Sequence, residues 1–223
     1  MCQPCAVLYL ASLPSLLPNA KLQLAMDTSQ FGNEEYTVGW ICALQEEFDV
    51  ATAMLDSEHG LPQSLPEHDT NAYILGEIGQ HKIVMACFPA GGMGVGAAAI
   101  VADNMRRTFK SIRFGLLVGI GGGAPSQGRD IRLGDVVVSV PKGSYGGVVQ
   151  YDFGKVEAGG TVTHRGQLNS PPEKLLTNVA LLQNLLSRLK NPKNCVRKFL
   201  EELEGLNEEY GYPAKDDKLF QSS

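Results

Sequence analysis

A run of glycines between two apolar segments constrains the fold of this chain more than any other feature. Residues 112–118 are largely apolar, residues 119–123 contain four glycines, and residues 136–140 form a second apolar run. The apolar runs predict buried β-strands. Glycine lets the intervening loop bend sharply and lets a ligand approach main-chain N–H groups without a Cβ in the way. The segment therefore predicts either a ligand-binding loop between two strands or a tight turn required only by chain geometry.

The residues before this loop alternate between strand and helix signals. Residues 36–43 predict a buried first strand, and the helical spacing of Phe48, Ala51 and Met54 predicts a helix that starts near Gln45. Four further elements are expected: a loop at 59–71, two short strands at 72–78 and 81–87 joined by a Gly79-Gln80 turn, and an alanine-rich helix at 95–109. This alternation predicts an α/β fold with a three-layer, mostly parallel sheet.

The order of these elements also predicts where a ligand site lies. The strand ends carrying Glu46, Glu47, Gly91–Gly94 and Gly119–Gly123 are expected to meet at one rim. Open α/β sheets bind ligands at the carboxyl ends of their strands. The sequence therefore favours a site built from three loops.

The C-terminal part is expected to be less regular. Its predicted elements are a loop region at 143–169 with one strand around 147–151, a helix that begins after Pro171-Pro172, a second helix at 196–206, and a polar tail.

Residues 1–35 predict a disordered extension ahead of a domain at 36–220. Residues 6–17 have the apolar character of a secretion signal, but no Lys or Arg precedes them and they contain Pro14. Met26 begins a polar segment and is a plausible natural start. Secretion remains the alternative to an extension.

Composition narrows the partners and the compartment. The formal net charge of −5 provides no basic excess for neutralising phosphates, so a nucleic-acid partner is not expected. The five widely spaced cysteines do not form a disulfide pattern, which favours the cytoplasm. No apolar run is long enough to span a membrane. The four histidines have no metal-ligand spacing, so we expect neither a metal nor a cofactor.

The residues at the predicted rim each have two interpretations. Glu46 and Glu47 can orient or deprotonate a water, or they can be solvated residues favoured by the helix dipole. Residues 91–94 can capture an anion at a helix N-terminus, or they can allow close packing of the helix. Asp135 is expected to have a structural role, and residues 151–155 are expected to pack in the fold rather than to stack on a base.

The order of the motifs resembles the nucleoside phosphorylase/nucleosidase superfamily. The matching segments are Ala43-Leu44-Gln45-Glu46-Glu47, Gly92-Met93-Gly94, Val118-Gly119-Ile120-Gly121-Gly122 and Gly134-Asp135-Val136-Val137-Val138-Ser139. The likeness covers about residues 36–220. The chain most resembles the phosphorylase-like N-terminal domains of fungal multidomain proteins that carry NTPase, ankyrin or tetratricopeptide segments.

The resemblance implies a site for small-molecule nucleosides. The family cleaves N-glycosidic bonds of nucleosides, with phosphate or water as the nucleophile. It implies that Glu47 positions the attacking water and that Met93 and Gly94 border the nucleoside. The matched loop residues Ile120, Gly121 and Gly122 would lie under the ribose. A homo-oligomer is also expected, because family members often complete their sites across a dimer interface.

Departures from the family pattern leave three functions open. Family phosphorylases hold phosphate with an Arg and a Ser at positions that match Leu117 and Ile120, so phosphate is not expected as a ligand here. The family's Met-Glu pair and its acidic Asp, which protonates the leaving purine, have no match, so the family domain is expected to be C-terminally incomplete. The candidates are hydrolysis of purine nucleosides, a non-catalytic nucleoside-binding or recognition module, and an inactive fragment of a longer protein.

Overall fold

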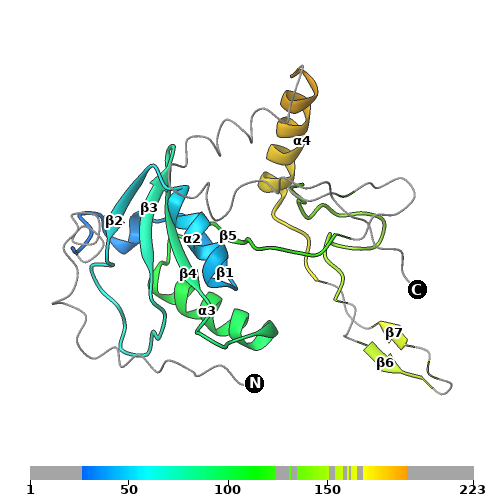
Figure 1. The fold of residues 1–223 in the computed structure, drawn as a ribbon, viewed down its shortest axis with the longest axis horizontal. Helices are drawn as coiled ribbons and strands as arrows, with labels where there is room; N and C mark the ends of the chain where they lie inside the picture. The colour runs from blue at the N-terminus through cyan, green and yellow to red at the C-terminus, as the bar shows by residue number, and fades with distance from the viewer. Residues whose placement is uncertain are drawn as a thin grey trace, which may run out of the picture. The chain divides into compact units, whose positions relative to one another are not determined.

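The computed structural model describes residues 27–123, 131, 135–150, 154–157, 160, 162–164 and 168–189. The chain divides into two compact units, Met1–Gly121 and Gly122–Ser223. The first contains a mixed sheet with two helices, and the second contains a short hairpin and one helix (Figure 1).

A five-stranded sheet forms the centre of the first unit. Its order is β2 (Ser57–Gly60), β3 (Ile74–Ile78), β4 (His81–Cys87), β1 (Val38–Cys42) and β5 (Phe114–Leu117). β1 lies parallel to β4 and β5, whereas β2, β3 and β4 are antiparallel to one another in turn. The predicted α/β class is confirmed, but the prediction of a mostly parallel sheet is wrong. The hairpin turn at Gly79 forces β3 and β4 to be antiparallel, and β2 adds a second antiparallel pairing at the outer side of β3.

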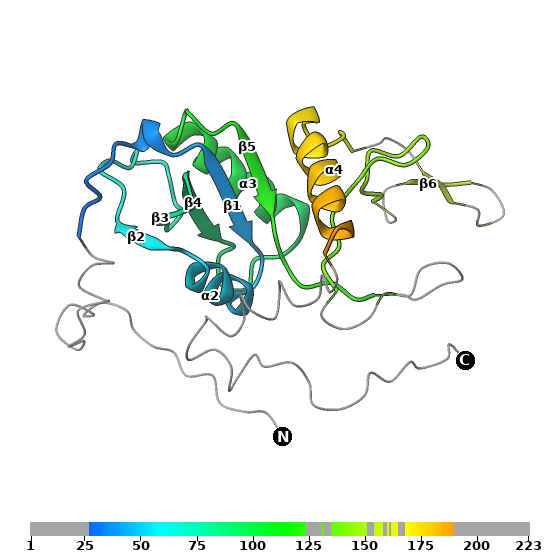
Figure 2. The same ribbon diagram turned by 90° about the horizontal axis from the view of Figure 1, so that it is seen from above.

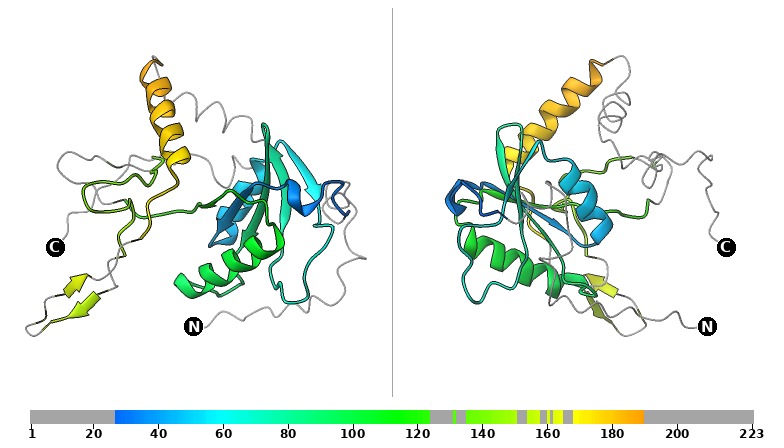
Figure 3. Two further views of the ribbon diagram at one scale, coloured as in Figure 1. Left: turned by 180° about the vertical axis from the view of Figure 1, so that it is seen from behind. Right: turned by 60° about the vertical axis from the view of Figure 1, so that its left-hand side comes forward.

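Helices cover both faces of this sheet. Successive residues of β4 divide between two buried clusters: Val84 lies in one with α3 (Gly94–Thr108), and Met85 lies in the other with α2 (Gln45–Ala53). Because successive side chains of a strand point to opposite faces, the helices lie on opposite sides of the sheet (Figures 2 and 3). The predicted three-layer arrangement is therefore present in this unit.

Residues 27–35 pack on the sheet, although the sequence placed them in a disordered extension. The backbone N–H of Ser29 donates to the carbonyl of Leu61 at 2.8 Å, and Ser29 is 3% exposed. Its hydroxyl lies 2.9 Å from the buried Tyr36 hydroxyl. The folded unit therefore includes these residues, because polar side chains that sequence patterns assign to loops find buried partners here.

His59 lies in β2, inside the stretch predicted as a loop. Its side chain is 4% exposed, with Nδ1 3.1 Å from the Tyr36 hydroxyl and Nε2 3.5 Å from a Glu77 carboxylate oxygen. The ring of Phe31 packs against it at 4.6 Å between centroids. Burial lowers the pKa of His59; Glu77 opposes this effect, and Lys82 adds to it. The imidazole is therefore held in its neutral form in the folded protein.

The free energy of unfolding is expected to fall on acidification because of His59. Its folded pKa lies below the ordinary value of 6.5, so the unfolded chain binds the proton more readily. The contribution is complete above pH about 6.5 and is lost as the pH falls through the folded value, with a slope of at most about 1.4 kcal/mol per pH unit. Glu35, Glu77 and Lys82 are the charged groups that act on the ring.

Urea unfolding at several pH values, followed by the fluorescence of the single tryptophan, Trp40, measures this effect. His59→Gln is expected to flatten the pH dependence, whereas His81→Gln, at an exposed position, is expected to leave it unchanged. Identical profiles for wild type and His59→Gln would contradict the assignment.

The second unit contains β6 (Gly154–Val156), β7 (Val162–His164) and α4 (Glu173–Ser187). The helix predicted after Pro171-Pro172 is confirmed, whereas the antiparallel β6–β7 pair lies within the stretch predicted as a loop with one strand. Residues 136–140 form no strand, and Val136 is 78% exposed, so this prediction is wrong. A β-branched run becomes a strand only when a partner pairs with it. Residues 147–150 also lack a strand, and the predicted helix at 196–206 lies outside the described residues.

None of the helices in the described ranges is long and apolar enough to cross a lipid bilayer.

Candidate functional site

Three strand ends lie at one edge of the sheet in the first unit. The parallel register pairs Cys42 with Cys87 and Ile41 with Leu117, so the carboxyl ends of β1, β4 and β5 are level. The segments that follow these strands form a surface that we call the rim: residues 43–47, 88–94 and 118–121. The carboxyl ends of the three strands therefore lie together as predicted, although Gly122 and Gly123 of the predicted rim belong to the second unit.

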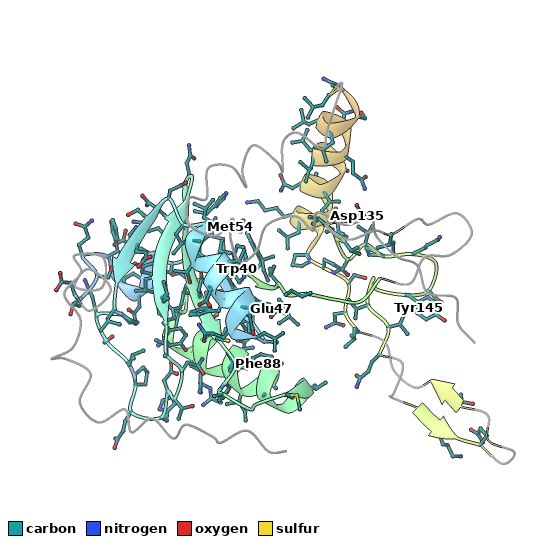
Figure 4. All side chains as sticks on the ribbon, viewed as in Figure 1. Trp40, Glu47, Met54, Phe88, Asp135 and Tyr145 are labelled. Carbon is teal, nitrogen blue, oxygen red and sulfur yellow. The ribbon has the colours of Figure 1, made fainter. Side chains whose placement is uncertain are left out.

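The carboxylate of Glu47 joins two segments of the rim (labelled in Figure 4). Its Oε2 accepts the backbone N–H groups of Ala43 at 2.8 Å and Leu44 at 3.0 Å. Its Oε1 accepts the backbone N–H of Ile120 at 2.7 Å. Ala43 and Leu44 precede α2, and Ile120 follows β5. A side chain from the first turn of α2 therefore holds the glycine loop, and we call this arrangement the Glu47 clamp.

The clamp keeps Glu47 ionised although the residue is only 9% exposed. Burial alone would raise the pKa of this carboxyl group. The backbone N–H groups of Ile120, Leu44 and Ala43 outweigh that effect and hold the pKa below its ordinary value. Glu47 is therefore a hydrogen-bond acceptor at neutral pH.

This geometry separates two roles that the sequence left open for Glu46 and Glu47. Glu46 is exposed, as expected of a solvated residue at a helix start. Glu47 is buried and engaged. A carboxylate oxygen has two lone pairs, and Oε1 accepts one protein hydrogen bond, from Ile120. That oxygen can accept one more hydrogen bond, from a hydroxyl group or a water molecule. Because the pKa of Glu47 is lowered, its carboxylate is a weak base.

Gly119 is required by the clamp rather than by the bend of the chain. A Cβ at this position would lie 2.6 Å from Oε1 of Glu47 and 2.9 Å from its carboxyl carbon. Gly121, two residues further on, has nothing within 4 Å of such a Cβ. The glycines of this loop therefore have different functions, and Gly119 is the one that admits the carboxylate.

The turn between β4 and α3 forms the third segment of the rim. Gly91 and Gly94 have φ angles of 78° and 79°, which favour glycine. Met93 is the N-cap residue of α3, and its side chain is 85% exposed. Ile120 is similarly exposed, at 77%. Two apolar side chains of the rim are thus exposed to solvent.

Not every residue predicted for the site lies in this unit. Glu47, Met93, Gly94, Ile120 and Gly121 belong to the first unit, whereas Gly122 begins the second. Asp135 also lies in the second unit. Tyr151, Asp152 and Phe153 lie outside the described residues.

Two thiols lie beneath the rim, where the sequence indicated only small buried hydrophobes. Cys42 and Cys87 are partners in the β1–β4 register and are both free. Burial raises the pKa of Cys42 to about 11, and burial likewise raises the pKa of Cys87. Both thiols are protonated at neutral pH, so the sequence interpretation as packing residues agrees with their chemistry.

The sequence singled out Ile120 and the N–H groups of its loop as contacts for a ligand rather than for Glu47, and it did not single out the N–H groups of Ala43 and Leu44. Leu44 and Glu47 have the spacing of a helix N-cap residue and its N3 carboxylate, a signal that sequence alone contains. The bond to Ile120, 73 positions away, has no such signal. Among the described residues, no group of three His, Cys, Asp or Glu side chains is placed to hold a metal.

Comparison with known proteins gives one informative similarity. No family model matches the chain, and no solved structure matches it. The chain is 47% identical over 186 residues to a "Nucleotide-binding leucine-rich repeat (NLR)-like protein" of the fungus Hyaloscypha variabilis. The alignment covers 83% of this chain and 18% of that protein. The chain is thus similar to a minor segment of a much longer fungal protein.

Proposed function

We propose that the rim is a nucleoside-recognition site within a module of an NLR-type fungal protein. The observation that carries the proposal is the Glu47 clamp, which positions an ionised acceptor next to an exposed glycine loop. A ribose presents hydroxyl donors that suit such an acceptor. The exposed side chains of Met93 and Ile120 offer apolar contact for a flat base.

Two further observations support this proposal. The rim lies at the carboxyl ends of parallel strands, where α/β sheets bind their ligands. The order of its motifs resembles that of the nucleoside phosphorylase superfamily. The name of the Hyaloscypha variabilis relative assigns nucleotide binding to that protein, of which the aligned segment is 18%. We propose that the segment is a recognition module of the longer protein.

Hydrolysis of the N-glycosidic bond is the second candidate. It is favoured by the remaining acceptor capacity of Glu47 Oε1, which suits a water held for attack on the ribose. In that reaction water adds to the anomeric carbon, the bond to the base breaks, and the base leaves with a proton. The lowered pKa of Glu47 favours orienting the water over removing its proton.

Binding and turnover are measured on the purified full chain with adenosine, inosine and guanosine. Calorimetry reports binding, and chromatography reports release of the free base with and without phosphate. Glu47→Ala is expected to weaken nucleoside binding by about tenfold or more and to abolish any hydrolysis, because the loop loses its anchor and the ligand loses an acceptor. Glu46→Ala, which removes an exposed neighbouring carboxylate, is expected to change neither by more than about twofold.

The outcomes separate the two candidates. Binding without base release supports recognition alone. Release that does not depend on phosphate supports hydrolysis. A folded chain that binds none of the three nucleosides would refute the proposal.

A further inference from the structure

The Glu47 clamp occupies backbone donors at the start of α2 and in the glycine loop that could otherwise hold an anion. The N–H groups of Ala43, Leu44 and Ile120 converge at 2.7–3.0 Å on the two oxygens of one carboxylate. Convergent backbone N–H groups of this kind commonly bind phosphate in other proteins. Here they already hold a negative charge that belongs to the chain.

The basic side chains of residues 27–121 also lie away from the start of α2, which is acidic. Glu46, Glu47 and Asp49 lie in the first turns of α2, at the rim, and the Coulombic influence of all three reaches Cys87 at the end of β4. Residues 27–121 contain five basic side chains: Lys82, Arg106, Arg107, Lys110 and Arg113. Lys82 is the second residue of β4. Arg106 and Arg107 lie in the last turn of α3, and Lys110 and Arg113 precede β5.

These positions place every basic side chain of residues 27–121 away from the rim. The rim follows the last residues of β4 and β5 and contains the first residue of α3. The basic residues lie at the opposite ends of the same elements, and Lys82 and Arg107 are further engaged by Glu35 and Asp103. No cation of this stretch is therefore available to offset the charge of a phosphate at the rim.

We propose that Glu47 is a specificity-determining residue that closes the rim to phosphate and to phosphorylated ligands. The site accepts the uncharged nucleoside and rejects the corresponding nucleotide. An approaching phosphate finds the three amide donors occupied and meets the carboxylate charge at short range. The identity of the accepted ligand rests on the proposed function, but the exclusion of anions does not.

The test measures binding of three probes to the full chain: adenosine, adenosine monophosphate and inorganic phosphate. Wild type is expected to bind adenosine and neither of the others. Glu47→Gln keeps the shape of the side chain but removes its charge and one acceptor oxygen, so the amide of Ile120 becomes available. This variant is expected to gain at least about tenfold in affinity for phosphate and for the monophosphate. Glu46→Gln removes the same formal charge without releasing a donor and is expected to gain less than about twofold.

Each result supports or overturns the inference. Phosphate binding that appears in Glu47→Gln and not in Glu46→Gln supports the inference. If in addition no variant binds adenosine, only the proposed nucleoside site is refuted. Equal gains in the two variants would assign the effect to general charge and overturn the role of Glu47. Wild type that binds the monophosphate as tightly as adenosine would overturn the inference while leaving nucleoside recognition intact. The melting temperature of Glu47→Ala, measured with and without phosphate, provides a second readout. The inference requires that phosphate raise the melting temperature of this variant.

Discussion

Gly119→Ala is expected to lower the free energy of unfolding by about 3 kcal/mol, because the new methyl group displaces a carboxylate that holds two segments together. The Cβ would lie 2.6 Å from Oε1 of Glu47. A free glutamate side chain would swing aside at little cost, but this one is fixed by three backbone N–H groups. The expected loss is therefore that of the hydrogen bonds to a charged acceptor.

A double-mutant cycle isolates this cause. In a Glu47→Ala background the methyl group meets no carboxylate, so Gly119→Ala is expected to cost less than about 1 kcal/mol there. Gly121→Ala is the matched control, because its Cβ would have nothing within 4 Å. Urea unfolding followed by Trp40 fluorescence gives all four corners of the cycle. If the two backgrounds gave the same cost, strain elsewhere in the loop would be responsible and the clamp would not explain Gly119.

Phe109→Ala is expected to cost about 3–5 kcal/mol, the usual range for a large aromatic side chain removed from a well-packed core. Phe109 follows α3 and is fully buried. Its ring meets the rings of Tyr36 and Tyr73 edge-on, at 5.8 and 5.1 Å between centroids. Such contacts add to the effect of burial. The loss is expected as a shift of the urea midpoint with an unchanged denaturant slope.

The control for this prediction lies on α3, the helix that Phe109 follows. Ile100→Ala removes an apolar side chain that is 60% exposed and is expected to cost less than about 1 kcal/mol. Phe109→Leu provides a milder core change if the alanine variant does not fold. Equal losses for Ile100→Ala and Phe109→Leu would contradict the packing described for this cluster.

The elements that sequence predicted well have local causes. The helix near Gln45 follows from apolar spacing and an acidic first turn, and the turn at Gly79 follows from a glycine between two apolar runs. β2 has no such signal: its sequence, Ser57-Glu58-His59-Gly60, is polar. It becomes a strand because β3 offers an edge with which it pairs. This second antiparallel pairing could not be predicted from local pattern, whereas the antiparallel β3–β4 pair follows from the turn at Gly79.

The candidate site divides in the same way. Glu47 was singled out because it follows a buried strand and because its motif resembles that of a known family. Its bonds to Ala43 and Leu44 are local to the helix start. Its bond to Ile120 requires β1 and β5 to lie parallel and in register, which no short segment encodes. The prediction for residues 136–140 was wrong for a related reason. A valine run specifies the tendency to form a strand, whereas the pairing partner decides the outcome.

Three acidic side chains lie in the first turns of α2, whereas the basic side chains of residues 27–121 lie at the far ends of β4, α3 and β5 from the rim. Long-range fields act before contact and orient a molecule as it approaches a charged partner. An anionic solute that nears the rim therefore meets the repulsive field of Glu46, Glu47 and Asp49 before it makes contact. This repulsion declines as salt is added, so discrimination against anionic ligands at the rim is expected to be greatest at low ionic strength.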